Sequence, residues 1–516
     1  MYVSRRSFFQ LSSAAALVPP LSRFLASSQP SDSELCRKLA NDPLRPQYHL
    51  MPAHNWMNDP NGPIFYRGRY QMFYQYNPQA AVWGNMNWAH ATSPDLIHWQ
   101  HEPIAISPTP NGSDRDGVFS GSAVLNNGRP TMIYTGVAPP ATDGEATLRD
   151  GHHTWKETQC LAVAADDDLR TWKKLADPVI AAPPAGLEVT GFRDPFVWRE
   201  NGRWMLILGS GFRGKGGAIL LYTSTDLQHW TYLHPLVEGA PSHTDATNPV
   251  DTGDMWECPD FFPLGNKHVL LISTVGKVRW KVGTYANERF SPEKEGVVDW
   301  GSYYAAKSML DKDGNRILWG WIPEARPNAD LIAAGWAGAM ALPRVLTLNS
   351  ENELQSEVHP AVQMLRANHI SINAGASAGE PKKRIDELRV RGLSGELSMQ
   401  WQVKDESAFH LQSDSGEKFA TISVSSKSGL RELKVNNVSG PLAGEPGSPI
   451  DIRLLIDGSV LEVFANRTNA MTVRVYSVPS GPLGLRFDSN SEIKSLDYWQ
   501  MKPISKDRLT GSLCGK

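Results

Sequence analysis

The sequence predicts an all-β protein in which a five-bladed β-propeller is followed by a C-terminal β-sandwich. A pattern of polar motif, apolar strand, Gly-containing turn and second strand recurs five times between residues 55 and 325, and such a repeat is typical of propeller blades. After about residue 380, alternating apolar and polar residues dominate, as they do in antiparallel sandwiches. We therefore expect a propeller over residues 45–348, a linker over 349–378 with a short helical piece near Pro360, and a sandwich over 379–505.

The first 30 residues have the pattern of an export signal. Ser4-Arg5-Arg6 precedes a short apolar stretch at residues 14–18, and small residues follow near position 27. This order is similar to twin-arginine signals, so we expect export to the periplasm or the extracellular space; a disordered basic tail is the alternative. No later segment holds 18 or more uninterrupted apolar residues, so no transmembrane helix is expected.

The composition narrows the class of partner. The formal net charge of -3 gives no basic footprint, which argues against nucleic acid as a partner. Many of the 17 Trp stand beside Asp, Asn or Gly, as suits stacking on the apolar faces of sugars, although filling of β-rich cores explains Trp equally well. The four cysteines, Cys36, Cys160, Cys258 and Cys514, have long, irregular spacings. We expect free thiols or at most one incidental bridge, and no metal site.

The turn glycines define the five repeats and place their hairpins. They are Gly68, Gly128, Gly202, Gly265 and Gly314, and their spacing is 49 to 74 residues. Glycine turns between apolar runs are hairpin signals. A second motif, Asp-Leu-x-x-Trp, recurs at residues 95–99, 168–172 and 226–230. We interpret it as an outer turn whose Trp packs between blades.

The same repeat brings acidic residues to matching positions. Ser120, Asp194 and Glu257 each lie eight residues before a turn glycine, and Asp59 lies nine before Gly68. Because the innermost strands of a propeller run the same way along its axis, these side chains should converge at one end of the channel. Two carboxylates on either side of the scissile bond are what glycoside hydrolysis requires. The alternative is that the acids cap turns at the blade starts.

The flanking residues suggest different environments for the acids. Asp59 lies in His54-Asn-Trp-Met-Asn-Asp-Pro-Asn-Gly-Pro63, and Pro60 restrains the backbone there. Arg193, beside Asp194, should keep that acid ionised. Glu257 has no adjacent cation in the sequence, so its surroundings should favour the protonated form that a general acid needs.

Taken together, these motifs resemble glycoside hydrolase family thirty-two. The matching segments are residues 56–62, 119–122, 192–195, 257–258 and 335–344, and the likeness runs from about residue 48 to about residue 500. The family implies a propeller followed by a sandwich, and a retaining double displacement on β-fructofuranosides without metal or other cofactor. It also implies that Asp59 is the nucleophile, Glu257 the acid/base and Asp194 the stabiliser of the transition state.

The resemblance implies a fructosyl pocket as well. Its polar residues should be Asn58, Gln75, Trp83, Ser120 and Arg193, with Trp56 and Phe119 as walls. Ordinary blade packing is the alternative for Gln75 and Trp83. Family members often carry Trp where this chain has Phe119, and Phe lacks the indole N–H donor.

The C-terminal half of the chain contains fewer motifs that indicate catalytic or binding residues. Residues 457–466 resemble the family's sandwich signature, and we interpret Glu462 there as structural or interfacial. Carbohydrate binding by the sandwich is an alternative role, because sandwich folds host many functions.

The leading hypothesis is release of terminal non-reducing β-fructofuranosyl units from sucrose, inulin or levan. A fructosyltransferase would share the first chemical step. An inactive sugar-binding propeller and an inverting arabinan-cleaving propeller are further alternatives. In the loop after the acid/base strand this chain has Lys277 and Arg279 but lacks the Asp common in sucrose-preferring plant members, which favours exo-acting fructan hydrolysis with sucrose as an additional substrate.

Overall fold

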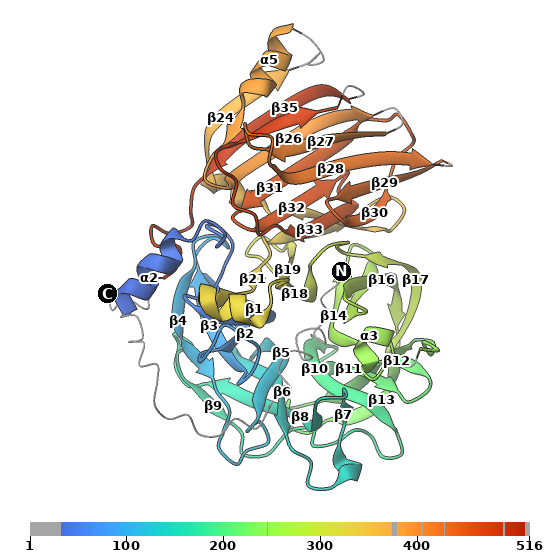
Figure 1. Cartoon of the computed structure of the whole chain (residues 1–516). Coiled ribbons are helices and arrows are strands. Elements are labelled where there is room, and N and C mark those ends of the chain that lie inside the picture. Colours follow the sequence, from blue (N-terminus) through green and yellow to red (C-terminus); the bar gives the residue numbers. More distant parts are fainter. Residues whose placement is uncertain are drawn as a thin grey trace.

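The computed structural model describes residues 32–510, apart from 245, 374–378, 404–405, 428 and 489–490. The expected export signal at residues 1–30 lies outside the described residues. Five sheets surround a common centre and a sandwich of two further sheets lies against one side of them (Figure 1). The predicted fold class is therefore confirmed. Within the described ranges, no helix is both long enough and apolar enough to cross a membrane.

Each propeller blade begins with the strand nearest the centre, namely β1, β5, β10, β14 or β18 (Figure 1). The first blade consists of β1 (Asn55–Tyr66), β2 (Arg69–Asn77), β3 (Asn87–Ser93) and β4 (Gln100–Ile106). The second consists of β5 (Gly117–Asn126), β6 (Arg129–Ala138), β7 (Leu148–Arg149), β8 (Thr154–Ala164) and β9 (Trp172–Lys174), with η1 (Asp143–Glu145) in a loop.

The remaining three blades follow the same order. The third consists of β10 (Val189–Glu200), β11 (Arg203–Phe212), β12 (Gly216–Ser224) and β13 (Thr231–Glu238). A short helix, α3 (Pro249–Thr252), precedes the fourth, which consists of β14 (Glu257–Leu264), β15 (Lys267–Thr274), β16 (Lys277–Ala286) and β17 (Arg289–Val297). The fifth consists of β18 (Tyr304–Leu310), β19 (Arg316–Ile322), β21 (Ala339–Met340), β22 (Arg344–Leu348) and β23 (Leu354–Val358).

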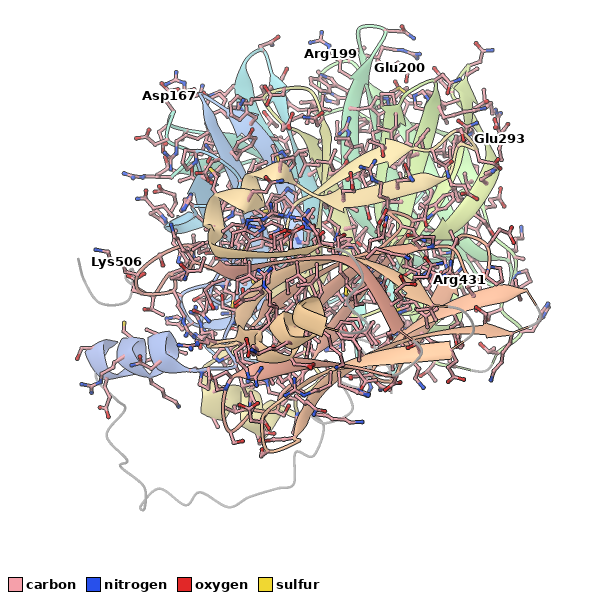
Figure 2. All side chains as sticks on the ribbon, turned by 90° about the horizontal axis from the view of Figure 1, so that it is seen from above. Asp167, Arg199, Glu200, Glu293, Arg431 and Lys506 are labelled. Atoms are coloured by element: carbon pink, nitrogen blue, oxygen red, sulfur yellow. The ribbon has the colours of Figure 1, made fainter. Side chains whose placement is uncertain are left out.

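The predicted turns join the first two strands of every blade. Arg67-Gly68, Asn127-Gly128 and Asn201-Gly202 each have two consecutive residues with positive φ. This geometry matches the right-handed twist of the flanking strands, and it explains why Gly occupies the second position. Charged residues such as Asp167 and Glu293 lie toward the outside of the blades (Figure 2).

The Asp-Leu-x-x-Trp motif forms an outer turn, as predicted. In the first blade Asp95 Oδ1 accepts hydrogen bonds from the backbone N–H groups of Ile97 and His98, and Trp99 Nε1 donates to Leu96 O. The Trp99 ring meets Trp319 of the fifth blade edge to face at 5.6 Å. The turn therefore positions a ring that packs between neighbouring blades.

The chain after β19 returns to the start of the propeller. The helix α4 (Asn328–Ala334) leads into β20 (Trp336–Ala337), which pairs in parallel with Asn55 and Trp56 of β1. Gly338 has a φ of 80°, and a Cβ there would lie 2.2 Å from Met57 O. Glycine is required because the two segments approach so closely. This pairing joins the first and last blades.

Two six-stranded antiparallel sheets form the sandwich. One holds β24 (Arg366–Asn373), β26 (Ser394–Val403), β31 (Ile450–Asp457), β32 (Val460–Ala465), β33 (Asn469–Arg474) and β35 (Ser491–Met501). The other holds β25 (Arg389–Val390), β27 (Glu406–Gln412), β28 (Lys418–Lys427), β29 (Leu430–Val435), β30 (Val438–Leu442) and β34 (Leu483–Phe487).

The segment expected to be a linker is largely structured. Within 349–378, β23 pairs with β22 of the fifth blade and β24 pairs with β35 of the sandwich. The predicted short helical piece is η2 (Pro360–Leu365), which separates the two strands. Backbone pairing partners distant in sequence, which the local composition does not reveal, make these residues part of the two sheets. Two helices, α2 (Asp32–Asn41) and α5 (Gly379–Glu387), carried no clear sequence signal.

A group of fully buried charges, which we call the interface cluster, joins the propeller to the sandwich. It consists of His49, Asp299, Arg344, Asp457 and Glu462. His49 Nδ1 lies 2.7 Å from Asp457 Oδ2 and its Nε2 lies 2.9 Å from Glu462 Oε1. Arg344 Nη2 donates to Glu462 Oε2 at 2.7 Å and to Asp299 Oδ2 at 2.9 Å. Glu462 is thus an interfacial residue, as the sequence predicts.

The cysteines fall within the expectation of at most one bridge. Cys36 is disulfide-bonded. Cys160 and Cys258 are free and buried. Of these, Cys258 lies among the predicted catalytic acids.

Candidate active site

The five innermost strands share one irregularity, a β-bulge near the predicted catalytic positions. An extra residue shifts the register between Met57 and Pro60, Val118 and Gly121, Arg193 and Phe196, Glu257 and Asp260, and Tyr304 and Lys307. A bulge bends a strand and changes the direction of its side chains, and such bulges are common beside active sites. The same device therefore recurs in every blade.

The bulges place the predicted acids in adjacent rather than identical positions. Asp59 and Ser120 are the second residues of their bulges, Asp194 is the first, and Glu257 stands just before one. The expected equivalence of Ser120, Asp194 and Glu257 is thus offset by one residue between blades. Asp194 has a φ of 64° and Cys258 a φ of 47°. Such left-handed conformations are uncommon for non-glycine residues and cluster at functional sites.

Asp59 lies in a buried hydrogen-bond network made of predicted pocket residues. Ser120 Oγ donates to Asp59 Oδ2 at 2.5 Å, and Asn58 Nδ2 donates to Asp59 Oδ1 at 3.1 Å. Gln75 accepts from Asn58 at 2.6 Å and donates to Ser120 Oγ at 2.9 Å. Trp56 Nε1 donates to Asn58 Oδ1 at 2.8 Å. Donors to both carboxylate oxygens favour the ionised form of Asp59 and fix its orientation.

Asp194 is linked to Asp59 through Cys258. The backbone N–H of Cys258 donates to Asp194 Oδ2 at 2.9 Å. The Cys258 Sγ lies 3.3 Å from Asp194 Oδ2 and 3.5 Å from Asp59 Oδ2. Burial, followed by the charges of Asp194 and Asp59, raises the pKa of the Cys258 thiol well above its ordinary value. The thiol therefore stays protonated and serves as a weak donor to both carboxylates.

Arg193 is directed mainly at Glu257 and not at its sequence neighbour. Its Nη2 donates to Glu257 Oε1 at 2.9 Å, whereas its Nε lies 4.0 Å from Asp194 Oδ2. Its Nη1 donates to Glu157 Oε1 at 2.9 Å. The expectation that Glu257 lacks a nearby cation is therefore wrong, because the fold brings the third blade's arginine to the fourth blade's acid. Asp59, Glu157, Asp194 and Glu257, which share this region with Arg193, are called the carboxylate cluster below.

Tyr304 provides the second hydrogen bond to Glu257. Its hydroxyl donates to Glu257 Oε2 at 2.8 Å. A tyrosine hydroxyl is both donor and acceptor, so the same contact serves an ionised or a protonated Glu257. This flexibility suits a carboxyl group that gains and loses a proton.

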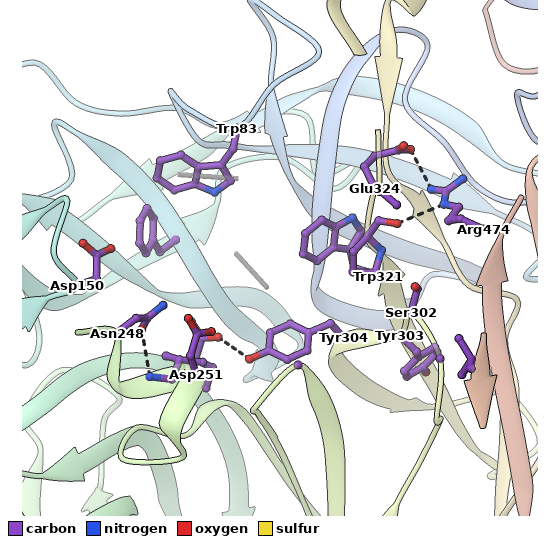
Figure 3. A pocket seen from close by; sticks show the side chains of 18 of the residues that line it. Trp83, Asp150, Asn248, Asp251, Ser302, Tyr303, Tyr304, Trp321, Glu324 and Arg474 are labelled. Carbon is purple, nitrogen blue, oxygen red and sulfur yellow. Dashed lines mark hydrogen bonds and ion pairs between the residues drawn. The ribbon is translucent and has the colours of Figure 1, made fainter. Parts of the chain in front are cut away.

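A cavity of about 210 Å³ opens above these residues and reaches the sandwich (Figure 3). Glu257, Arg193, Trp83 and Phe119, all predicted site residues, line it. The other predicted residues, Asp59, Asp194, Asn58, Gln75, Ser120 and Trp56, are buried. Asp194 and Ser120 directly follow the lining residues Arg193 and Phe119 in the chain, and the hydrogen bonds described above join the others to them. The structure therefore brings all ten predicted residues together in one region.

Aromatic rings form one wall of the cavity. Phe119 meets Trp83 at 6.0 Å and Trp155 at 5.5 Å, both edge to face. His153 stacks on Trp155 with a centroid distance of 4.1 Å. Edge-to-face packing fixes ring planes, so these rings present a rigid surface. Such a surface suits the apolar face of a sugar.

Sequence reasoning missed Tyr304, Glu157 and Trp155. Tyr304 occupies in the fifth blade the place of Glu257 in the fourth, immediately before the bulge. The count of repeat positions would have missed it, because Tyr304 lies ten residues before Gly314 and the positions eight and nine before that glycine are alanines. Glu157 and Trp155 lie on β8, the third strand of their blade, where no motif marks them.

The comparisons with known proteins agree with this geometry. Residues 49–358 match the description "Glycosyl hydrolases family 32 N-terminal domain", and residues 376–500 match "Glycosyl hydrolases family 32 C terminal". A sucrose-6-phosphate hydrolase from Escherichia coli is 36% identical over 461 residues, which cover 84% of this chain and 90% of the relative. A beta-fructofuranosidase, insoluble isoenzyme, from Arabidopsis thaliana is 31% identical over 84% of this chain and 86% of its own.

A solved structure extends the likeness to three dimensions. The fructan 1-exohydrolase IIa from Cichorium intybus superposes with a TM-score of 0.74 and 26% identity, over 89% of this chain and 98% of that one. The family match spans both domains and includes all the motifs that converge on the cavity. The chain therefore belongs to glycoside hydrolase family 32.

Proposed function

We propose that this protein is a retaining glycoside hydrolase that releases terminal non-reducing β-fructofuranosyl units from sucrose, inulin or levan. The observation that carries the proposal is the meeting of three carboxylates from three blades around Cys258, beside an aromatic-walled cavity that Glu257 lines. In this proposal an end unit binds between Asp59 and Glu257, and the rest of the substrate extends into the cavity that Glu257 lines.

Asp59 acts as the nucleophile in this proposal. Its carboxylate attacks the anomeric carbon of the fructosyl unit and forms a covalent fructosyl-enzyme. The donors Ser120 and Asn58 hold both of its oxygens and thereby restrict it to one orientation. Restricting the nucleophile in this way removes rotational freedom before the reaction begins.

Glu257 acts as the acid and then as the base. It protonates the departing glycosidic oxygen, and in the second step it takes a proton from the water that releases fructose. Arg193 and Tyr304 hold its two oxygens. When Glu257 becomes ionised, Arg193 stabilises the charge.

Asp194 stabilises the transition state. The oxocarbenium-like transition state carries positive charge, and a second fixed carboxylate close to Asp59 opposes that charge. Fixed charges of this kind are effective because they need no reorganisation during the reaction. Asn58, Gln75, Ser120, Trp56, Trp83 and Phe119 complete the fructosyl pocket in this proposal.

The proposal is tested with the purified chain on sucrose, inulin and levan. Release of free fructose is expected, and replacement of Asp59 by Asn should lower kcat by at least about 10⁴-fold while leaving the melting temperature close to that of the wild type. Asp167→Asn, the same change at a position with a 65% exposed side chain, is the matched control. Activity that persists in Asp59→Asn would overturn the assignment, and growing oligosaccharides in place of fructose would identify a fructosyltransferase.

We also propose export from the cytoplasm. The support is the Ser4-Arg5-Arg6 motif followed by the short apolar stretch. Replacing Arg5 and Arg6 by Lys should leave fructose-releasing activity inside the cells that produce the protein. Unchanged activity in the periplasm or the medium would contradict export by this route.

A further inference from the structure

The cavity is lined by both acidic and basic side chains. The hydrogen bonds and ion pairs that these side chains already make determine which charges remain to interact with a leaving group. Four carboxylates and two guanidiniums line it: Asp150, Asp251, Glu257, Glu324, Arg193 and Arg474. Asp59 and Asp194 are buried close by and both contact Cys258, which follows the lining residue Glu257 in the chain. Carboxylates therefore outnumber cations among the described residues at this site.

Both arginines of the lining are already engaged by protein oxygens. Each of the three nitrogens of Arg193 donates to Glu157 or Glu257. Arg474, from the sandwich strand β33, donates through Nε to Pro323 O, through Nη1 to Ser459 Oγ and through Nη2 to Ile322 O. Its Nη2 also lies 3.1 Å from Glu324 Oε1. A phosphate would have to compete with these protein oxygens for the two guanidiniums.

Two further cations near the cavity, Arg326 and Lys277, are occupied in the same way. Arg326 lies behind Glu324, with its Nε 3.0 Å from Glu324 Oε2. Lys277 lies behind Gly301 and its amine donates to the carbonyls of Trp300 and Gly301. The charged groups of Arg326 and Lys277 therefore pair with an acid and with backbone carbonyls of the protein itself.

Two carboxylates stand on the part of the lining contributed by the second blade and by α3. Asp150 Oδ1 accepts from the backbone N–H groups of His152 and His153, and its Oδ2 lies 3.2 Å from His153 Nδ1. Burial works to raise the pKa of Asp150, but the hydrogen bonds from His153 and from the backbone outweigh it and lower the pKa. Asp251 lies on α3 and Figure 3 shows it near Asn248. Both acids therefore add negative charge to the lining of the cavity that Glu257 also lines.

We propose that this site discriminates leaving groups by charge, accepting uncharged sugars and rejecting phosphorylated ones. The inference rests on the proposed function and narrows it, because it names the substrate class of the same site. A phosphate group carries about -1.5 to -2 charges at neutral pH, and like charges brought together in a partly desolvated site oppose binding strongly. The relevant substrate is therefore neutral sucrose or a neutral fructan, unlike the substrate in the name of the Escherichia coli relative.

The test compares kcat/KM of the full chain for sucrose, inulin and sucrose 6-phosphate at low and at high ionic strength. At low salt, kcat/KM for sucrose 6-phosphate should be roughly 100-fold below that for sucrose. The difference should narrow as salt rises, because salt screens charge repulsion and leaves shape exclusion unchanged. Equal or faster turnover of sucrose 6-phosphate would overturn the inference and leave fructosyl release intact. If neither sucrose nor inulin yields fructose, the proposed function fails and the inference falls with it.

A substitution in the cavity lining tests whether the discrimination between sucrose and sucrose 6-phosphate arises in the cavity. Asp251→Asn should raise the ratio of kcat/KM for sucrose 6-phosphate over sucrose by about fivefold, since one repelling charge is removed. Asp167→Asn, which changes the net charge equally but lies on the outside of the blades (Figure 2), should leave that ratio unchanged. Equal ratios in both variants would show that charge in the cavity does not control the choice.

Discussion

The carboxylate cluster and the interface cluster are both made of buried side chains, yet they compensate their charges differently. In the carboxylate cluster, three of the four acids, Glu157, Asp194 and Glu257, have an oxygen within 4.0 Å of the guanidinium of Arg193. In the interface cluster, Arg344 bridges Glu462 and Asp299, and His49 bridges Asp457 and Glu462. Every acid of the interface cluster therefore has a cation within 3 Å, while the carboxylate cluster has more acids than cations.

The difference shows how each cluster is used. Buried charges destabilise a fold unless they are paired and hydrogen-bonded, and the interface cluster meets this condition with partners from both domains. The carboxylate cluster keeps an excess of negative charge at the point where the reaction develops positive charge. We therefore expect substitutions in the carboxylate cluster to change activity, and substitutions in the interface cluster to change stability.

The largest expected effect is on activity. Glu257→Gln removes the proton donor and should lower kcat by about 10³- to 10⁴-fold, with little change in melting temperature because Gln still fills the space beside Arg193 and Tyr304. The measurement is initial-rate kinetics with sucrose together with thermal unfolding. Glu188→Gln, at a side chain that is 81% exposed, is the control. If Glu257→Gln also lowered the melting temperature enough to explain the loss of activity, the expected difference between the two clusters would be wrong.

The next effect is on stability. Glu462→Gln leaves Arg344 and His49 with one buried carboxylate fewer and should lower the free energy of unfolding by about 3 to 5 kcal/mol. The kcat of the molecules that remain folded should be unchanged. Glu351→Gln removes a partner of an exposed ion pair, with 72% of the Glu351 side chain exposed, and should cost less than about 1 kcal/mol. Chemical denaturation of both variants makes the comparison, and equal losses would show that burial at the interface is unimportant.

The interface cluster also predicts a pH dependence. Burial works to lower the pKa of His49, but the hydrogen bonds to Asp457 and Glu462 outweigh it and raise the pKa from 6.5 to about 9. Since the folded value is the higher one, His49 contributes stability that is complete below about pH 6.5 and is lost as the pH rises through 9. The loss is on the order of 3 kcal/mol.

Unfolding free energies measured from pH 6 to 10 should show this decline. His49→Gln should be less stable than the wild type at pH 6 and should show a flatter slope across the same range. If the wild type and His49→Gln decline in parallel, another group is responsible for the dependence.

The smallest effect concerns Glu157, which touches the site only through Arg193. Glu157→Gln leaves the guanidinium of Arg193 to act mainly on Glu257, so kcat/KM should fall about tenfold and the alkaline limb of its pH profile should move to lower pH. A uniform fall in kcat with an unmoved limb would mean that Glu157 only supports the fold. The pH profile of kcat/KM on sucrose distinguishes the two outcomes.

Much of the architecture could be predicted because it repeats. The turns at Gly68, Gly128 and Gly202 require positive φ, and this local requirement is visible in sequence. The alternation in residues 396–402 and 450–456 predicted strands that the structure contains as β26 and β31. The strands β23 and β24 inside the expected linker could not be predicted, because they depend on partners far away in the chain.

The sequence by itself determined the number of blades, the presence of a sandwich, and the motifs that carry Asp59, Asp194 and Glu257. The tertiary structure alone decided how these residues meet. Relative to the bulges, Asp194 lies one position and Glu257 two positions before the place of Asp59. Arg193 contacts Glu257 more closely than Asp194, and Arg474 of the sandwich is part of the cavity lining. Local sequence governs turns and strand periodicity, whereas contacts between side chains on different blades follow from strand irregularities and domain packing. For that reason the acids could be found in the sequence, but their partners and the leaving-group side of the cavity could not.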